Sequence, residues 1–285
     1  MSFDAKNSKI REICENLLKN NEVEVVIGYT KGEEGELRIP CFVKDPADVV
    51  KLEWGELCYS NLATYLHGLN KKAAILAKPC DTRAISQYIT EQQVKRENVV
   101  IIGMDCIGMK NEEGAPRPGC AECTVRKPVL FDYHIEDTGV NEIKSAEKAA
   151  LPESQEEKME KFRKEIDKCI LCYACRQSCY GCYCKNCFIE RDATNWQPLE
   201  IDTGTKMTFH MGRTMHLAGR CVDCGACEAA CASGVNIRYI IKEVTDFVEE
   251  LYDYRAGLDP EKSPALLENA FDDKEVGFLG GEKHG

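Results

Sequence analysis

Residues 169–187 read CILCYACRQSCYGCYCKNC and contain seven cysteines. The first four are spaced Cys-x-x-Cys-x-x-Cys-x-x-x-Cys, and residues 221–231, CVDCGACEAAC, repeat that spacing. In proteins with two iron–sulfur clusters, such a run supplies three thiolates to one [4Fe-4S] cluster and its fourth thiolate to the other cluster. The repeat therefore predicts a pair of [4Fe-4S] clusters and indicates a role in electron transfer.

The same rule assigns four thiolates to each of the two clusters. The first cluster is expected to take Cys169, Cys172, Cys175 and Cys231, and the second Cys221, Cys224, Cys227 and Cys179. Three further cysteines, Cys182, Cys184 and Cys187, exceed what these two clusters need. With Cys179 they suit a zinc site, in which case Cys179 is lost to the second cluster. Alternatively, they join a cysteine of the N-terminal half in an additional cluster, and the sequence leaves both choices open.

Two other uses of cysteine compete with iron–sulfur binding. Disulfides need an oxidising compartment, but the N-terminus, MSFDAKNSKI, is polar and lacks the apolar segment of a signal peptide. Structural zinc sites are built from pairs of cysteines, so the third and fourth cysteine of each repeated run would be surplus. Iron–sulfur binding is the favoured interpretation, and a zinc-stabilised interaction module is an alternative.

Composition limits the class of protein. The chain has 285 residues, of which 44% are hydrophobic, and a formal net charge of −11. This length allows two domains, and no apolar run approaches the ~18 residues of a membrane span. An acidic surface repels nucleic acid and anionic lipid. We therefore expect a cytoplasmic protein with no nucleic-acid partner and no direct membrane insertion.

The N-terminal half has the pattern of an α/β domain. A helical apolar stripe follows Ser8, a plausible N-cap, and extended stretches are expected at residues 23–29 and 37–43. Residues 61–69 are expected to be helical. Residues 73–103 then show an apolar strand, a helix over 82–90 and a second apolar strand, which is a βαβ signature. The half is therefore expected to form a mainly parallel sheet covered by helices.

Four cysteines of this half are expected at one edge of the sheet. Cys80 and Cys106 each follow a predicted parallel strand, and Asp81 and Asp105 beside them are expected to be N-caps. Ligands of open α/β sheets bind at the carboxyl ends of the strands. Cys120 and Cys123 lie in the loop APRPGCAEC, which is expected to fold back over that edge. The four thiols then hold a third [4Fe-4S] cluster, unless they are merely small packing residues.

The C-terminal half is predicted to be mainly α-helical. Ser154 and Glu157 form a capping box, and a stripe of Met207, Met211 and Met215 indicates a helix before the second cysteine run. Because forty-two residues separate Cys179 from Cys221, a helical two-cluster ferredoxin is favoured over the compact hairpin type. The expected organisation is an α/β domain at 1–140, a linker at 141–157, the ferredoxin domain at 158–258 and a tail at 259–285.

Two stretches resemble known families. AKPCDTRAI, IIGMDCIGM and GCAECTVRKPVLFD resemble the beta-subunit family of deazaflavin-coenzyme-reducing hydrogenases and formate dehydrogenases, over roughly residues 20–135. MHLAGRCVDCGACEAACASGV is similar to the helical ferredoxin segments of heterodisulfide reductase. The first resemblance implies a [4Fe-4S] cluster on Cys106, Cys120 and Cys123 with Cys80, and often a flavin such as FAD. This chain lacks a Gly-x-Gly-x-x-Gly fingerprint, which puts a bound flavin in doubt.

The expected function is an iron–sulfur electron-transfer subunit of a cytoplasmic anaerobic oxidoreductase complex. Its partner would be a hydrogenase, a formate dehydrogenase or a heterodisulfide-reductase-like flavoprotein. The alternative is a self-sufficient flavin-dependent oxidoreductase that reduces a deazaflavin or nicotinamide carrier. No catalytic residue is predicted, because the five histidines are scattered along the sequence.

Overall fold

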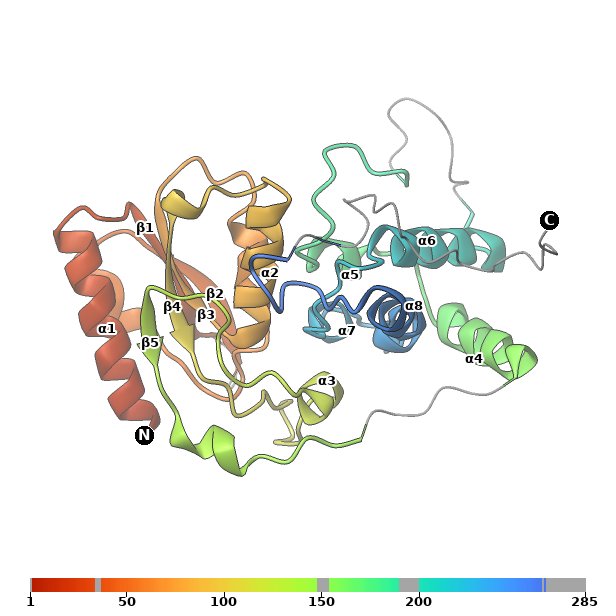
Figure 1. Ribbon diagram of the computed structural model, residues 1–285, viewed down its shortest axis with the longest axis horizontal. Coiled ribbons are helices and arrows are strands. Elements are labelled where there is room, and N and C mark those ends of the chain that lie inside the picture. The colour runs from red at the N-terminus through yellow and green to blue at the C-terminus, as the bar shows by residue number, and fades with distance from the viewer. Residues whose placement is uncertain (1, 34–36, 148–153, 190–199, 263, 265–285) are drawn as a thin grey trace, which may run out of the picture.

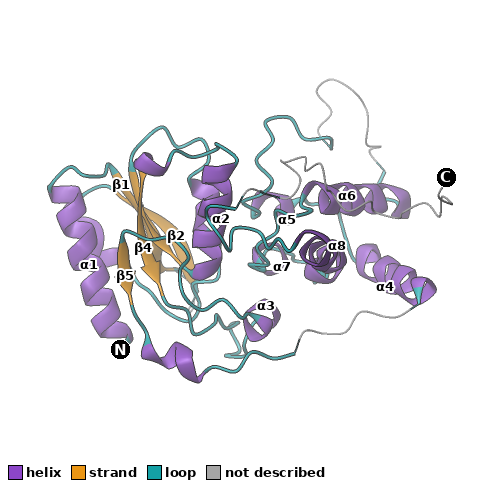
Figure 2. Ribbon diagram, viewed as in Figure 1, coloured by secondary structure: helices purple, strands orange, loops and turns teal. Residues whose placement is uncertain are grey.

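The computed structural model describes residues 2–33, 37–147, 154–189, 200–262 and 264. Figure 1 shows an α/β part that carries the sheet and a helical part that lies beyond helix α2. All the strands belong to the first part, and α4 to α8 make up the second (Figure 2). The predicted fold class is confirmed: a mostly parallel sheet with helices is followed by a mainly helical region.

The sheet has five strands in the order β2-β1-β3-β4-β5. β1 pairs with β2 in the antiparallel direction, and the other neighbours are parallel. All five residues of the central strand β3 are buried, which is typical of a parallel strand covered on both faces. The strands are β1 (Val25–Lys31), β2 (Arg38–Val43), β3 (Ala73–Ala77), β4 (Val99–Met104) and β5 (Tyr133–Ile135).

Helices α1 (Phe3–Lys19) and α2 (Pro79–Thr90) lie on opposite faces of this sheet (Figure 1). Ser2 is the N-cap of α1 and accepts a hydrogen bond from the backbone N–H of Ala5. The prediction that Ser8 caps this helix was therefore wrong, because the helix begins earlier and Ser8 lies inside it. Cys14 is fully buried in the core.

The first turn of α2 carries Cys80. Lys78 occupies the N-cap position, and the Asp81 carboxylate accepts hydrogen bonds from the backbone N–H groups of Lys78 (2.8 Å) and Leu62 (3.2 Å). Asp81 is thus the third residue of the helix and not its N-cap. Asp105 does not cap a helix either, because its carboxylate pairs with His134 and accepts from the N–H of Asp137. Both predicted N-caps were wrong.

Short 3-10 helices connect the elements of the α/β part. Residues 61–69, expected to be helical, contain only the short helix η2, and the loop around Cys120 forms the short helix α3. These elements are η1 (Pro46–Lys51), η2 (Leu62–Tyr65), η3 (Arg96–Asn98), α3 (Pro118–Glu122) and η4 (Thr138–Glu142).

The two cysteine runs have the same backbone conformation. Leu171 and Tyr173 in the first run have φ of 52° and 59°, and Asp223 and Gly225 in the second have φ of 56° and 70°. A four-residue helix follows each run's second left-handed residue. The sequence repeat is therefore also a structural repeat. The helices of this part are α4 (Gln155–Asp167), α5 (Ala174–Gln177), α6 (Thr203–His216), α7 (Ala226–Ala229) and α8 (Ile237–Tyr252).

The predicted helix before the second cysteine run is α6, and it buries a face other than its methionine stripe. Met211 and Met215 are exposed, whereas Phe209 and Arg213 are buried. The inward face of this helix contacts the cysteine runs, where the positive charge of Arg213 is favourable. The predicted capping of α4 is confirmed, since Ser154 accepts from the N–H of Glu157.

One hydrophobic cluster spans both parts and includes Tyr180 and Val222 of the helical part, which also has a second cluster of its own. Polar contacts fix the same interface. Arg83 of α2 donates to the carbonyl of Val222 (3.0 Å), and Glu91 pairs with Arg220 at 2.7 and 2.8 Å. Among the described residues, no helix combines the length and apolarity needed to cross a bilayer.

A buried ion pair joins the first helix to the far edge of the sheet. The Lys6 ammonium contacts the Asp137 carboxylate, and both side chains are almost inaccessible. Burial alone would raise the pKa of Asp137, but Lys6 and the N–H of Gly139 lower it below its ordinary value. We expect Asp137→Asn to lower the free energy of unfolding by roughly 2 kcal/mol at pH 7, because Lys6 keeps an uncompensated charge.

A carboxylate with a lowered pKa stabilises the fold above its unfolded-state pKa of about 4 and loses this effect as pH falls further. The difference between wild type and Asp137→Asn is therefore expected to be constant from pH 5 to 7 and to shrink below pH 4. Urea unfolding at several pH values measures it. A difference that stayed unchanged down to pH 3 would contradict this role of the Asp137 charge.

Candidate metal centres

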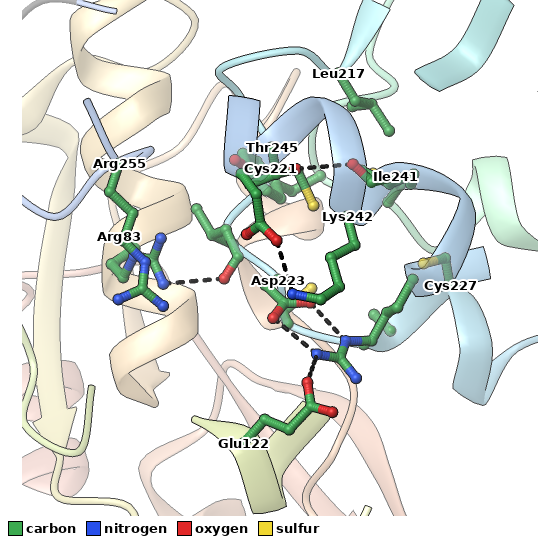
Figure 3. Close-up of a pocket in the computed structure, with 18 of the residues that line it drawn as sticks. Arg83, Glu122, Leu217, Cys221, Asp223, Cys227, Ile241, Lys242, Thr245 and Arg255 are labelled. Carbon is green, nitrogen blue, oxygen red and sulfur yellow. Dashed lines mark hydrogen bonds and ion pairs between the residues drawn. The ribbon is translucent and has the colours of Figure 1, made fainter. Parts of the chain in front are cut away.

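The four thiols predicted to bind the second cluster lie around one cavity between the two parts of the chain. Helix α7 carries Cys227, the turn before it carries Cys221 and Cys224, and Cys179 follows α5. Figure 3 shows this cavity, with Arg83 and Glu122 reaching it from the α/β part. The structure thus brings together the fourth cysteine of the first run and the first three of the second.

Arg213 is a buried cation that interacts electrostatically with these thiols. It is buried on α6 and lines the cavity, and its guanidinium donates to the carbonyl of Cys175 at 3.2 Å. Burial alone would lower the pKa of Arg213, but Cys179 and Cys227 raise it, so the side chain stays charged. A hydrogen bond from Cys182, supported by Arg213, lowers the pKa of Cys179 below its ordinary value. Thiolates are the form that binds metal, so this environment favours a ligand at Cys179.

The pKa values of two other thiols of this group, Cys221 and Cys224, are raised and not lowered. Burial raises the pKa of Cys221 to about 12 and that of Cys224 to about 11. Both are therefore protonated at neutral pH in the free protein, and binding a metal must release their protons.

The four thiols predicted for the first cluster are also close together. Burial raises the pKa of Cys175 to about 11, and Cys169, Cys231 and Cys172 act on it electrostatically. Backbone N–H groups face two of the sulfurs, from Leu171 to Cys169 at 3.3 Å and from Val235 to Cys231 at 3.4 Å. Hydrogen bonds of this kind are a regular feature of iron–sulfur ligands and help to set the reduction potential.

The third predicted group surrounds a cavity of about 350 Å³ beyond the carboxyl ends of β3 and β4. Cys80 lies in the first turn of α2, Cys106 follows β4, and α3 with its C-cap residue brings Cys120 and Cys123. The N–H of Gly108, whose φ of 101° favours glycine, points at the Cys106 sulfur at 3.4 Å. The structure therefore assembles all four thiols that the sequence placed at this edge.

This third cavity adjoins the cavity of the second group. Cys224 lines both of them, and Cys80 and Cys224 are close enough to act on each other electrostatically. Cys224 is therefore the cysteine that the two cavities share. Cys182, Cys184 and Cys187 do not face the cysteines of the α/β part, because the residues lining their cavity all come from the helical part.

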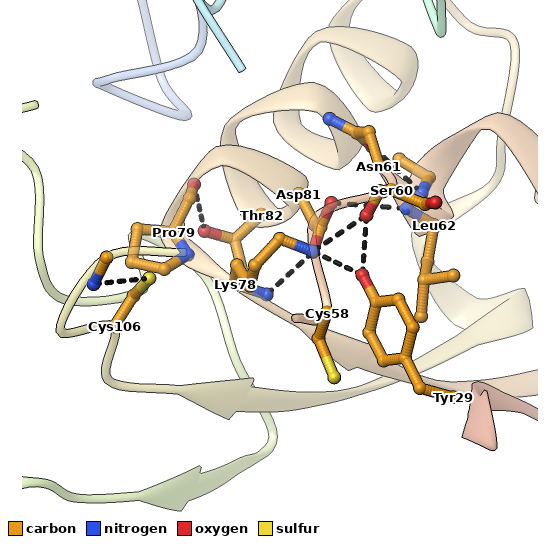
Figure 4. Close-up of polar contacts among 12 residues, drawn as sticks. Tyr29, Cys58, Ser60, Asn61, Leu62, Lys78, Pro79, Asp81, Thr82 and Cys106 are labelled. Atoms are coloured by element: carbon orange, nitrogen blue, oxygen red, sulfur yellow. Dashed lines mark hydrogen bonds and ion pairs between the residues drawn. The ribbon is translucent and has the colours of Figure 1, made fainter. Parts of the chain in front are cut away.

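A buried network surrounds Lys78 at the start of α2, the helix whose first turn carries Cys80 (Figure 4). The Lys78 ammonium contacts the Asp81 carboxylate at 2.9 Å, the carbonyl of Ser60 at 2.8 Å and the hydroxyl of Tyr29. Burial alone would lower the pKa of Lys78, but Asp81 and Tyr29 raise it well above its ordinary value. The Lys78 ammonium, paired with Asp81, therefore stays charged two residues before Cys80, a role that the sequence analysis missed.

Asn61 is a second missed residue. Its side chain is buried, Oδ1 accepts from the N–H of Ala63, and Nδ2 has no hydrogen-bond partner among the described residues. Figure 4 shows the amide nitrogen directed away from the Lys78 network. The Asn61 amide opposes the effect of burial on the pKa of Cys224, so it lies beside that sulfur. A buried amide of the α/β part thus borders a candidate ligand of the helical part.

We expect Asn61→Leu to lower the reduction potential of a cluster held by Cys224. An N–H···S hydrogen bond from this amide to a bound cluster is worth about 1 kcal/mol, and its loss corresponds to a shift of about 40 mV for one electron. A redox titration followed by electron paramagnetic resonance measures the shift, and Asn70→Leu on an exposed loop is the control. Equal potentials in Asn61→Leu and wild type would show that this amide does not influence the cluster.

Each group offers four cysteine sulfurs, the donor set of a [4Fe-4S] cluster. In the part of the chain that the structure describes, no three His, Cys, Asp or Glu side chains are arranged as ligands of one metal ion. A cluster has a different requirement, since each thiolate binds a different iron atom around a common core. Thiols placed around a cavity fit that requirement.

Comparison with models of protein families finds no match. The chain is 22% identical to the beta subunit of F420-dependent formate dehydrogenase from Methanocaldococcus jannaschii, over 87% of this chain and 91% of that protein. It is also 22% identical to the beta subunit of F420-dependent formate dehydrogenase 1 from Methanococcus maripaludis, over 88% of this chain and 90% of the relative.

Among solved structures, the F420-reducing [NiFe] hydrogenase complex from Methanosarcina barkeri matches with a TM-score of 0.30 and 12% identity. That match covers 38% of this chain and 39% of the other. The two sequence relatives show that the chain is distantly similar, over most of its length, to beta subunits of F420-dependent formate dehydrogenases.

Proposed function

We propose that this chain is an iron–sulfur electron-transfer subunit of an oxidoreductase complex. Two cubanes are assigned to the repeated runs and a third to Cys80, Cys106, Cys120 and Cys123. The observation that supports the proposal most strongly is that Cys224 borders both the second and the third group, which come from different parts of the chain. When bound, [4Fe-4S] clusters supply one-electron redox chemistry.

The residues around the groups have three tasks in this proposal. The cysteines hold the clusters, and Arg213 and Lys78 balance the negative charge of the thiolates. Leu217 and Tyr180, both buried at the second cavity, exclude water from it. Burial and hydrogen bonding to the sulfurs are the features by which a protein sets cluster potentials.

The partner is proposed from the relatives. Their names describe beta subunits of formate dehydrogenases that depend on the deazaflavin F420. We propose that this chain serves a formate dehydrogenase, a hydrogenase or a heterodisulfide-reductase-like flavoprotein, in the cytoplasm of an anaerobe. The net charge of −11 supports the absence of a nucleic-acid partner.

The test is cofactor analysis of the full chain purified without oxygen. We expect at least about twelve iron atoms, with a matching amount of sulfide, if three cubanes are present. Cys172→Ser and Cys106→Ser should each remove about four of them, because each variant lacks one ligand of a separate group. Iron that did not fall in either variant would refute the ligand assignment.

The same measurement separates the alternatives. Stoichiometric FAD, with turnover of a deazaflavin or nicotinamide carrier by the isolated chain, would identify a self-sufficient flavin-dependent oxidoreductase. Colourless protein that contained zinc and no iron would identify a zinc-stabilised interaction module.

A further inference from the structure

We propose that Cys182, Cys184 and Cys187 hold an additional [4Fe-4S] cluster, with the imidazole of His216 as its fourth ligand. This inference rests on the proposed function, which leaves these three cysteines without a role. They line one cavity of about 250 Å³. His216, the last residue of α6, lines the same cavity.

The size of the cavity favours a cluster over a single ion. A water molecule occupies about 30 Å³ in the liquid, so this space is several times larger than a mononuclear site needs. The three cysteines are separated by one and two residues and all line this space. Phe188 and Phe209 complete the wall and give the site an apolar side.

The additional site does not compete with the second group for Cys179. Cys179 lines the second cavity and is absent from the wall of this one. The Cys182 and Cys179 side chains are nevertheless close enough to act on each other. The two sites are thus neighbours, and each keeps its own ligands.

His216 is the ligand that the three thiols lack. Among the described residues that line this cavity, it is the one metal-binding side chain besides the three cysteines. Imidazole binds iron in iron–sulfur centres that combine histidine with cysteine. The His216 ring packs edge-on against Phe188, with 5.2 Å between the ring centroids, so its orientation is already restricted.

The charge of the wall suits an anionic cofactor. Three thiolates bring three negative charges, and Arg176, Arg213 and Arg220 line the same space. Arg220 is paired with Glu91, whereas Arg213 is buried beside the thiols of both neighbouring sites. Cys184 is exposed, so the proposed cluster would lie at the surface of the helical part. A redox partner protein could approach it there.

The experiment uses the full chain with its cofactors, purified without oxygen, and measures iron, sulfide and zinc. Wild type is expected to contain about sixteen iron atoms, the content of four cubanes. Cys184→Ser is expected to lose about four of them, together with one component of the electron paramagnetic resonance spectrum of the reduced protein. Cys41→Ser, on strand β2 and outside every group, is the matched control and should lose none.

A second variant tests the fourth ligand. His216→Cys is expected to keep all the iron, because a thiolate replaces the imidazole, but to change the spectrum of one cluster. An unchanged spectrum in His216→Cys would overturn the role of His216. One zinc atom per chain that disappeared in Cys184→Ser, with iron constant, would overturn the cluster in favour of zinc.

The two proposals can fail separately. If Cys172→Ser and Cys106→Ser each lose about four iron atoms and Cys184→Ser loses neither iron nor zinc, the additional cluster is refuted and the proposed function stands. If none of the three variants loses iron, both proposals are refuted.

Discussion

Replacing Cys224 with serine is expected to remove about four iron atoms per chain and to break the connection between the second and third groups. Both effects are expected because Cys224 borders both cavities and is one of the four thiols of the second group. Second-sphere changes alone typically lower metal affinity or activity by about 10- to 100-fold. The loss of a ligand should therefore empty the second site.

Iron and sulfide content measure the first effect. The connection is measured by electron paramagnetic resonance of the fully reduced protein, in which neighbouring clusters broaden each other's signals. We expect Cys224→Ser to lose the broadening between the second and third clusters and to keep a separate signal from the third. Cys58→Ser is the control, because Cys58 is a buried cysteine that lies outside every group. Full iron content in Cys224→Ser would mean that Cys224 only packs at the interface.

The spacing of cysteines was enough to predict which thiols lie together. The two runs were paired crosswise from their spacing alone, and the structure places Cys179 with the second run and Cys231 with the first. The third group was predicted from a fold rule, because strands that run parallel end at the same edge of a sheet. In both cases a regular backbone, the repeated turn or the parallel strand, fixes where the side chain goes.

The residues that surround the thiols could not be predicted in this way. Asn61 is buried because a segment more than a hundred residues away in the sequence packs over it. Arg213 is buried because the face of α6 that carries it is turned toward the cysteines. A methionine stripe at helical spacing indicates a helix but does not identify what its faces contact. Likewise, Ser2 and Ser8 are equally good caps in sequence, and only the packing of α1 decides between them.

The heterodisulfide-reductase-like character of the helical part stays a prediction, since both formate dehydrogenase relatives are matched over nearly the whole chain. Left-handed residues at 171, 173, 223 and 225 give both cysteine runs the same turn. It turns each run around its own site, so the first three thiols of a run face one space while the fourth leaves for the next.

Asp81→Asn is expected to be the most destabilising of the single substitutions considered. The Lys78 and Asp81 side chains are 2% and 0% exposed, so the variant leaves the Lys78 ammonium buried beside a neutral amide. Removing one partner of a buried pair costs about 3 to 5 kcal/mol, and the midpoint of thermal unfolding should fall accordingly. Asp48→Asn, in an exposed pair with Lys51, is the control and should change stability by less than about 1 kcal/mol.

The double variant Lys78→Met/Asp81→Leu separates charge from packing. Because apolar residues of similar volume often replace a buried pair at little cost, we expect it to recover much of the lost stability. Its iron content should still fall, since Asp81 also holds the first turn of α2, which carries Cys80, through the N–H groups of Lys78 and Leu62. Wild-type stability in Asp81→Asn would mean that Lys78 finds another partner. Recovered stability with full iron in the double variant would mean that Cys80 keeps its position without this pair.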